Sequence, residues 1–288
     1  MRLARVGEPG REIPVLIEGD VAWDLRPLTE DVDGRFLADG GLERIAAARH
    51  AGGLPPVELG DLRFGPPIAR PGTVVGVGMN YAAHAAESGS PAPTEPILFL
   101  KAASAVSGPR DAIVLPPGSA RTDWEVELGV VIGAPLHQAA DPADALRAVA
   151  GFVVVNDVSE REYQLQHPGG QWSKGKSFPG FAPTGPYLVT PDELEPSRLR
   201  LRSWVNGEPR QDSTSSDMIF GVDHLLWYAS RYLALEPGDL VLTGTPEGVA
   251  LSGRFPYLRP GDVVELEIEG LGRQRQHVVG AAGDKATA

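Results

Sequence analysis

The stretch from Thr122 to Ile132 alternates apolar and charged residues and then ends in an apolar run. This pattern predicts a β-strand with one face in the core. The alternation puts Glu125 and Glu127 on the same face, with Asp123 just before them. Because neighbouring carboxylates repel each other, the strand predicts a compensating partner, and Mg²⁺, Mn²⁺ and Ca²⁺ all bind carboxylate oxygens. A solvated strand face without a ligand is the alternative.

The composition excludes several classes of protein. The chain has 288 residues, of which 42% are hydrophobic and 22% are charged, which suits a globular protein with one large core or two unequal domains. The net charge is −12 and the arginines are scattered, so we expect no nucleic-acid partner. The chain has no cysteine, which leaves oxygen and imidazole as metal ligands. Because we find no signal peptide and no membrane-length apolar run, we expect a cytoplasmic protein without a membrane partner.

Residues 1–70 are predicted to form a small N-terminal β-rich domain with one helix. Arg2–Val6 and Ile13–Ile17 have the pattern of strands, and Gly41–Ala48 is rich in helix-forming residues. Proline-rich turns follow and place a domain boundary near residue 70. Residues 71–288 would then form the larger, catalytic domain, because nothing in the first unit indicates catalysis.

A short helix from Tyr81 to Glu87 carries a histidine and a carboxylate. Asn80 is positioned to cap this helix, and His84 and Glu87 lie three residues apart on one face. A carboxylate beside an imidazole orients it and raises its basicity, as a general base requires. An exposed surface pair is the alternative. The segment 88–93 lacks periodicity, so the helix could act as a lid on a mobile loop.

Two glycine-rich stretches invite a nucleotide-binding interpretation that their spacing does not support. Gly76-Val77-Gly78 ends an apolar strand, but the third glycine of the dinucleotide fingerprint is missing. Residues 169–178 contain glycines and two lysines without the Walker spacing. We therefore expect a loop here that points Lys176 into a pocket, with a solvated surface lysine as the alternative.

Two further polar groups follow predicted strands. Asp157 comes directly after a buried strand, with Arg161 and Gln164 within the next two turns. The loop 243–249 consists mostly of small residues, so its backbone N–H groups and the Thr245 hydroxyl could approach a substrate closely. A turn or cap role for Asp157 and an ordinary connecting loop are the alternatives.

Three elements have strong local signals. Asp141 followed by Pro142 predicts the start of a helix. Asn206-Gly207 at the end of an apolar strand predicts a tight β-hairpin. Val222–Leu233 has the pattern of an amphipathic helix.

Taken together, these motifs resemble the fumarylacetoacetate hydrolase family over residues 71–280. The closest resemblance is to members that act on 2,4-diketo-3-deoxy sugar acids or other acylpyruvates, and residues 1–70 are similar to the small N-terminal domain of some members. The matching pieces are Gly78-Met79-Asn80-Tyr81 with His84 and Glu87, Asp123 to Leu128, Asn156 to Arg161, Gly175 to Phe178, and Thr243 to Val249.

The resemblance implies an α+β fold that is mostly β, a mixed β-roll. It also implies that Glu125, Glu127 and Asp157 bind a divalent metal, Mg²⁺ or Mn²⁺. His84 and Glu87 match the general-base pair of the family on its lid. A homodimer is implied as well.

The remaining matches concern the substrate. Lys176 matches a residue that stabilises developing negative charge, and Arg161, Gln164 and Thr245 match substrate contacts. The chain departs from the family at Pro179-Gly180, where many members have Asp-Thr. We expect this departure to change a wall of the substrate pocket and therefore the choice of substrate.

The implied function is metal-dependent hydrolysis of a C–C bond in a 2,4-diketo acid, giving pyruvate and a carboxylic acid. Decarboxylation of oxaloacetate-like acids and enol–keto isomerisation are alternatives on the same site, because both use a metal-stabilised enolate. A non-catalytic binding protein with the same fold is a further alternative. With His84 as the base, activity should fall in acid near the usual histidine pKa of about 6.5.

Overall fold

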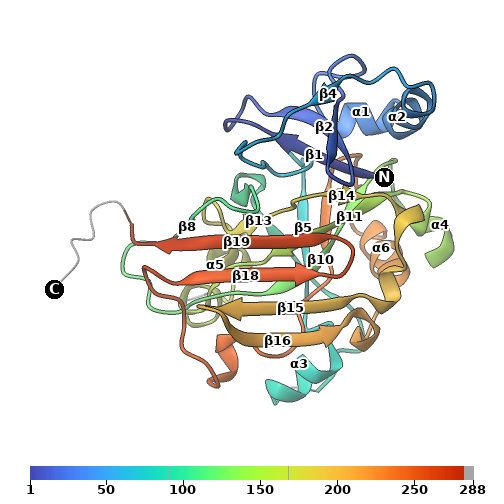
Figure 1. The fold of residues 1–288 in the computed structure, drawn as a ribbon. Helices are drawn as coiled ribbons and strands as arrows, with labels where there is room; N and C mark the ends of the chain where they lie inside the picture. The colour runs from blue at the N-terminus through green and yellow to red at the C-terminus, as the bar shows by residue number, and fades with distance from the viewer. Residues whose placement is uncertain (90, 168, 282–288) are drawn as a thin grey trace.

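The chain folds into two stacked β-sheets with short helices at their edges (Figure 1). This computed structural model describes residues 1–89, 91–167 and 169–281. The prediction of an α+β fold that is mostly β is confirmed. None of the helices in the described part of the chain combines the length and the apolar character needed to cross a membrane.

The larger sheet has ten strands and connects the N-terminal residues to the rest of the chain. Its strands in spatial order are β4 (Pro56–Val57), β3 (Val21–Asp24), β2 (Ile13–Glu18), β1 (Arg2–Val6), β14 (Leu188–Val189), β11 (Val149–Asn156), β10 (Val126–Ile132), β17 (Leu240–Leu242), β5 (Val74–Gly78) and β6 (Ile97–Lys101).

The smaller sheet has five strands and packs on β10 and β11. Its strands in spatial order are β16 (Glu208–Thr214), β15 (Arg200–Val205), β18 (Val263–Ile268), β19 (Gly272–Val279) and β8 (Ile113–Val114). Two short pairs complete the strands: β9 (Thr122–Asp123) with β12 (Ser159–Glu160), and β7 (Val106–Ser107) with β13 (Ala182–Pro183).

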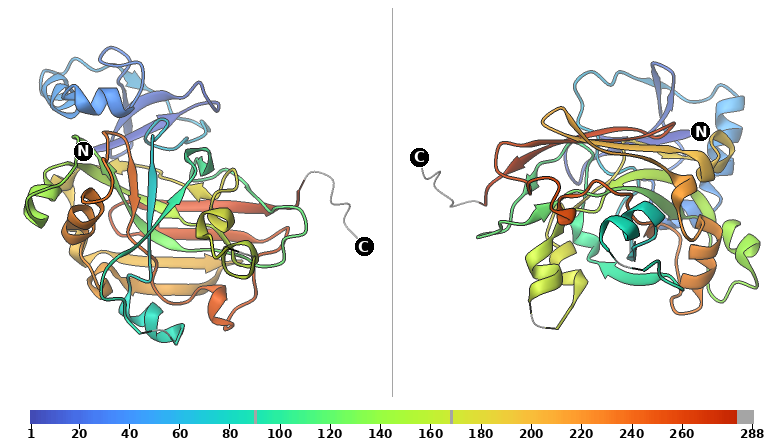
Figure 2. Two further views of the ribbon diagram at one scale, coloured as in Figure 1. Left: turned by 180° about the vertical axis from the view of Figure 1, so that it is seen from behind. Right: turned by 90° about the horizontal axis from the view of Figure 1, so that it is seen from below.

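The helices are short, and α4 and α6 pack against each other at one end of the molecule (Figure 2). The α-helices are α1 (Gly34–Ala38), α2 (Gly41–His50), α3 (Ala82–Glu87), α4 (Pro142–Leu146), α5 (Trp172–Lys176) and α6 (Val222–Ser230). The π-helix η2 covers Glu162–Gln166, and the 3-10 turns are η1 (Ala103–Ala105), η3 (Pro191–Glu193), η4 (Pro196–Arg198), η5 (Ser215–Asp217) and η6 (Ala250–Ser252).

The N-terminal unit, blue in Figure 1, joins the larger sheet through β1. Arg2 and Leu3 pair with Val189 and Leu188 of β14, so main-chain hydrogen bonding runs from this unit into the rest of the protein. The division of the chain near residue 70 remains a proposal.

The predicted strand from Thr122 to Ile132 is interrupted at Trp124 and Glu125, which separate β9 from β10. At the break, the Glu125 N–H donates to the side chain of Asn156, at Oδ1, over 3.1 Å, while the Glu125 carbonyl still accepts from the backbone N–H of Asp157 at 3.0 Å. Every residue of β10 is buried. The alternative of a solvated face is therefore wrong. The predicted core face is confirmed, because the apolar side chains of the strand belong to the main hydrophobic core, and the carboxylate face is buried as well.

Several local predictions are confirmed. Asp141 caps α4 by accepting from the Asp144 N–H, and the strands β15 and β16 form the predicted hairpin. Asn206 and Gly207 have φ values of 55° and 79°, as a type I′ turn requires. The helix expected at Val222–Leu233 ends earlier, at Ser230.

Two local predictions are wrong. Asn80 does not cap α3, because its side-chain amide donates to the carbonyls of Phe220 and Thr243 and so connects three segments of the chain. The loop expected at 169–178 contains helix α5, whose start is capped by Gln171. The predicted mobile segment 88–93 includes Ser90, which lies outside the described residues.

Candidate active site

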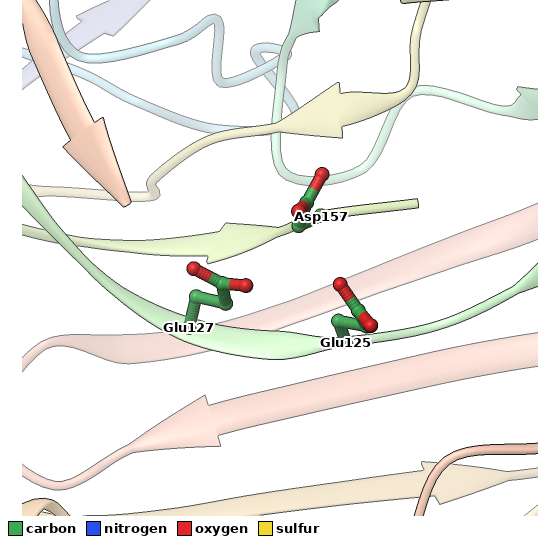
Figure 3. Close-up of side chains that lie close together, drawn as sticks. All are labelled: Glu125, Glu127 and Asp157. Carbon is green, nitrogen blue, oxygen red and sulfur yellow. The ribbon is translucent and has the colours of Figure 1, made fainter. Parts of the chain in front are cut away.

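Three buried carboxylates converge where β10 and β11 of the larger sheet meet at their ends (Figure 3). Glu125 precedes β10, Glu127 lies in β10, and Asp157 follows the last residue of β11. Because β10 and β11 are antiparallel and Val126 pairs with Asn156, the start of one strand meets the end of the other. Each of the three carboxylates offers one oxygen, and these oxygens all lie within 4.8 Å of one another.

Lys176, at the end of α5, binds two of these carboxylates. Its Nζ lies 2.8 Å from Glu125 Oε2, 2.6 Å from Asp157 Oδ2 and 2.8 Å from the Ser159 hydroxyl. The helical conformation of 172–176 is what turns this lysine inward. The predicted direction of Lys176 into a pocket is therefore observed, although the predicted loop is a helix.

Arg161 binds the other side of Glu125. Its Nη2 lies 2.6 Å from Glu125 Oε1, its Nε donates to Asp123 Oδ2 at 2.9 Å, and its Nη1 donates to Gln164 Oε1 at 2.9 Å. Asp123 is held by the backbone N–H groups of Ala250 and Leu251 and by this guanidinium. Asp123 therefore positions Arg161 and is not one of the three converging carboxylates.

Lys101 is a site residue that the sequence reasoning missed. It ends β6, its side chain is fully buried, and its Nζ contacts Asp157 Oδ1. It also donates to the Val158 carbonyl at 3.3 Å. A lysine that ends an otherwise apolar strand was the available signal in the sequence, but no local pattern connects it to a residue 56 positions later.

The electrostatics of the three carboxylates differ. Burial raises the pKa of Glu127 well above its usual value, and the neighbouring Asp157 and Glu125 raise it further. Burial acts in the same direction on Glu125, but Arg161 and Lys176 outweigh it and hold the pKa of that carboxyl below its usual range. Glu127 accepts a hydrogen bond from the Gly244 N–H at 2.8 Å and forms no ion pair with a described residue.

This arrangement fits a hard divalent cation. All three groups offer oxygen, which Mg²⁺ and Mn²⁺ prefer, and Glu127 lacks a cationic partner among the described residues. Four buried carboxylates, those of Asp123, Glu125, Glu127 and Asp157, face the three cations Lys101, Arg161 and Lys176. A divalent cation would offset the remaining negative charge.

His84 is buried in α3 and lines the same cavity. Its Nδ1 is buried and has no hydrogen-bond partner among the described residues. The nearest oxygen of Glu87 lies 3.9 Å away, which is too long for a hydrogen bond, and that oxygen accepts from the Gly248 N–H at 3.0 Å. Glu87 therefore attaches α3 to the loop 243–249, and its orientation of His84 remains a proposal.

The cavity has a volume of about 370 Å³ and brings together nearly all the predicted residues. Apart from Glu87, each predicted site residue lines it: His84, Glu125, Glu127, Asp157, Arg161, Gln164, Lys176 and Thr245. The Thr245 hydroxyl donates to the Val126 carbonyl at 3.0 Å and accepts from Gln211 Nε2 at 2.8 Å. Because its proton is already engaged, Thr245 holds the loop against β10.

Two glycines of β5 provide space for an aromatic wall of this cavity. A methyl group at Gly78 would lie 2.4 Å from Trp172, and one at Gly76 would lie 2.1 Å from Phe99. The two rings are 5.7 Å apart, and both line the cavity. The two glycines of Gly76-Val77-Gly78 therefore leave room for the aromatic rings of Phe99 and Trp172. This packing explains the glycine pattern, which the dinucleotide-binding interpretation did not explain.

The chain belongs to the fumarylacetoacetate hydrolase family. Residues 73–279 match the family described as "Fumarylacetoacetate (FAA) hydrolase C-terminal". The resemblance found in the sequence motifs is thereby confirmed, and the chain is an enzyme of a family of hydrolases and isomerases.

Individual relatives have different activities. A 2,4-didehydro-3-deoxy-L-rhamnonate hydrolase of Sphingomonas sp. (strain SKA58) is 47% identical over 96% of this chain and 96% of its own. The 5-carboxymethyl-2-hydroxymuconate delta-isomerase of Mycobacterium smegmatis has a TM-score of 0.78 and 34% identity, covering 98% of this chain and 100% of its own. The maleylpyruvate hydrolase of Sphingobium sp. SYK-6, in complex with manganese(II) and pyruvate, has a TM-score of 0.80 and 28% identity over the same shares.

Proposed function

We propose that this protein is a divalent-metal-dependent hydrolase that cleaves the C3–C4 bond of a 2,4-diketo acid to pyruvate and a carboxylic acid. The observation that carries the proposal is the cavity in which three carboxylates, a buried lysine and a buried histidine meet. The relative named as a 2,4-didehydro-3-deoxy-L-rhamnonate hydrolase and the neighbour that contains manganese(II) and pyruvate support it.

In this proposal, Glu125, Glu127 and Asp157 hold Mg²⁺ or Mn²⁺. A metal held there would supply Lewis acidity to the 2-keto acid group of the substrate. His84 takes a proton from water, and Glu87 orients the imidazole once the lid is closed. Neutral imidazole is favoured because burial lowers the pKa of His84.

The remaining steps balance without a further reactant. The water oxygen bonds to C4, the C3–C4 bond breaks, and its electron pair stays on C3, which then takes up a proton. Lys176 stabilises negative charge that develops on the substrate, because burial leaves this ammonium little solvent screening. Arg161 and Gln164 line the adjacent wall of the cavity, and in this proposal they contact the substrate.

Isomerisation is the second candidate function, because a solved relative with 34% identity is named as an isomerase. Decarboxylation of oxaloacetate-like acids would use the same carboxylates and lysine. The products distinguish the three reactions. Hydrolysis gives a carboxylic acid and pyruvate, decarboxylation releases CO₂, and isomerisation leaves the mass of the substrate unchanged.

The test is pyruvate release from acetylpyruvate by metal-stripped protein, with and without Mg²⁺ or Mn²⁺. We expect release that depends on added metal and is lost in the Asp157→Asn variant. Absence of pyruvate with both metals would overturn the hydrolase proposal, and oxaloacetate would then be the next substrate.

We also propose that the protein forms a homodimer through β6. This strand ends the order of the larger sheet, and the exposed Leu100 and Tyr232 line a groove beside it. A sheet edge with apolar side chains is a site for pairing with another chain. Sedimentation should give twice the mass of the chain, and Leu100→Glu should lower the self-association.

A further inference from the structure

We propose that this cavity selects diketo acids whose group beyond C4 is uncharged and ends in an apolar group. This inference rests on the proposed function, since it concerns the acyl part of the same substrate. It depends on how charged and apolar side chains are distributed around the cavity.

The cavity changes from ionic to aromatic over a short distance. Lys176 Nζ lies 2.8 Å from Glu125 at the carboxylate end and 4.9 Å from the ring centre of Phe99. The ring centre of Trp172 lies 5.7 Å from that of Phe99, and both rings line the cavity. A substrate anchored by its 2-keto acid group at the carboxylates and extending this way therefore reaches aromatic surface with the part beyond C4.

The cations around the cavity are already paired. Among the described residues that line it, Arg161 binds Asp123 and Glu125, and Lys176 binds Glu125 and Asp157. His84 is favoured in its neutral form because burial lowers its pKa. Because the proposed function already assigns Lys176 to the reacting end of the substrate, a second carboxylate would lose water without gaining a further cationic partner among these residues, which is costly.

The apolar wall extends to the mouth of the cavity. Leu165 and Ile97 line it and remain 45% and 40% exposed. Covering such surface with an apolar group is favourable at about 25 cal/mol per Å². Trp172, in this wall, packs closely on Gly78, where a methyl group would lie 2.4 Å from its ring.

The first experiment compares two substrates of similar length with the Mn²⁺-loaded protein. Pentanoylpyruvate ends in a methyl group, and succinylpyruvate ends in a carboxylate. We expect kcat/KM to favour pentanoylpyruvate by about 10-fold or more, as hydrophobic pockets discriminate. Equal rates or a preference for succinylpyruvate would overturn the inference.

Binding of both acids, measured by calorimetry, separates this inference from the proposed function. If neither acid releases pyruvate, the hydrolase proposal fails, and the ratio of the two Kd values still decides whether the cavity prefers the apolar tail. A ratio of one, or tighter binding of succinylpyruvate, would overturn the inference on its own.

The second experiment places a cation at the mouth. Leu165→Lys should improve kcat/KM for succinylpyruvate relative to pentanoylpyruvate by about 10-fold, since it supplies the missing partner. Leu146→Lys in α4 is the matched control, because Leu146 is 41% exposed and does not line the cavity. An unchanged substrate ratio in Leu165→Lys would contradict the proposed direction of the acyl group.

Discussion

Two networks of charged side chains in this protein differ in how completely they are neutralised. The first joins the N-terminal unit to the segment before β8. Arg5 binds Asp31 at 2.5 Å and Glu12 at 3.3 Å, and Arg63 binds Glu12 at 2.9 Å and Asp111 at 2.6 Å. Every carboxylate in this network has a guanidinium partner.

The second network is the buried cluster of charged side chains at the active-site cavity. In it, Lys101, Arg161 and Lys176 contact carboxylates, but none of these three cations contacts Glu127. Burial tends to raise the pKa of both Glu12 and Glu127. Hydrogen bonds and the nearby guanidinium of Arg63 reverse the effect for Glu12, whose pKa is lowered, whereas nearby carboxylates reinforce it for Glu127.

This difference separates a structural network from a binding site. Matched charges with good geometry compensate their own desolvation, while an unmatched buried carboxylate costs stability until a ligand offsets its charge. The comparison of Glu12 with Glu127 therefore identifies where this fold keeps an unfavourable charge arrangement, and the proposed function assigns that place to a metal. Three experiments test that conclusion.

The largest expected effect is on activity. Glu127→Gln should lower metal-dependent kcat/KM by more than about 100-fold, because even residues that only support metal ligands contribute about 10- to 100-fold. In metal-free protein the same change should raise the free energy of unfolding, because it removes an uncompensated carboxylate.

Glu12→Gln is the matched control in the first network. It should lower the free energy of unfolding, because it breaks contacts with Arg5 and Arg63, and leave kcat/KM unchanged. Denaturant unfolding and pyruvate release measure both quantities. Equal stability changes in the two variants would remove the distinction between the networks.

The next effect concerns stability and its dependence on metal. Lys101→Met removes one cation from Asp157 and should destabilise metal-free protein by about 3 kcal/mol, as expected for a broken buried ion pair. Adding Mn²⁺ should reduce the difference in free energy of unfolding between this variant and the parent protein, because a divalent cation replaces the lost positive charge.

Arg63→Met breaks two ion pairs of the first network, those with Glu12 and Asp111, and should lower the free energy of unfolding by an amount that Mn²⁺ does not reduce. Urea unfolding of the parent and both variants, with and without Mn²⁺, checks this. The idea of a metal-responsive network fails if the two variants respond alike to Mn²⁺.

The smallest effect is on pH dependence. Burial lowers the pKa of His84, so the acid limb of kcat/KM should lie below the value of about 6.5 expected from sequence alone. Because the unfolded chain binds this proton more readily, His84 also lowers the free energy of unfolding as pH falls from about 6.5 to the folded pKa.

The stability contributed by the first network should change only at a pH lower than the range in which His84 titrates. The pKa of Glu12 is lowered on folding, so its stabilisation is present above the unfolded value of about 4.3 and is lost as pH falls through the folded value. As pH falls, kcat/KM should therefore decrease at a higher pH than the one at which the contribution of Glu12 to the free energy of unfolding is lost. An acid limb of kcat/KM at or above about 6.5 would show that burial does not lower the pKa of His84.

The sequence by itself determined which chemical groups the site has and much of the local structure. Glu125 and Glu127 are two residues apart, and a nearly extended backbone carries both to one place despite the break between β9 and β10. Asp157 was predictable because it follows an apolar strand, and the turn at Asn206-Gly207 because few residues adopt positive φ. These features depend on neighbours along the chain.

The tertiary structure alone decided which groups neutralise each other. Lys101 reaches Asp157 across the sheet, Glu87 binds the backbone of Gly248, and Trp172 packs on Gly78. Each contact joins positions far apart in the sequence, so no local pattern encodes it. The physical reason is that burial and charge balance depend on everything packed around a group, which only the complete fold specifies.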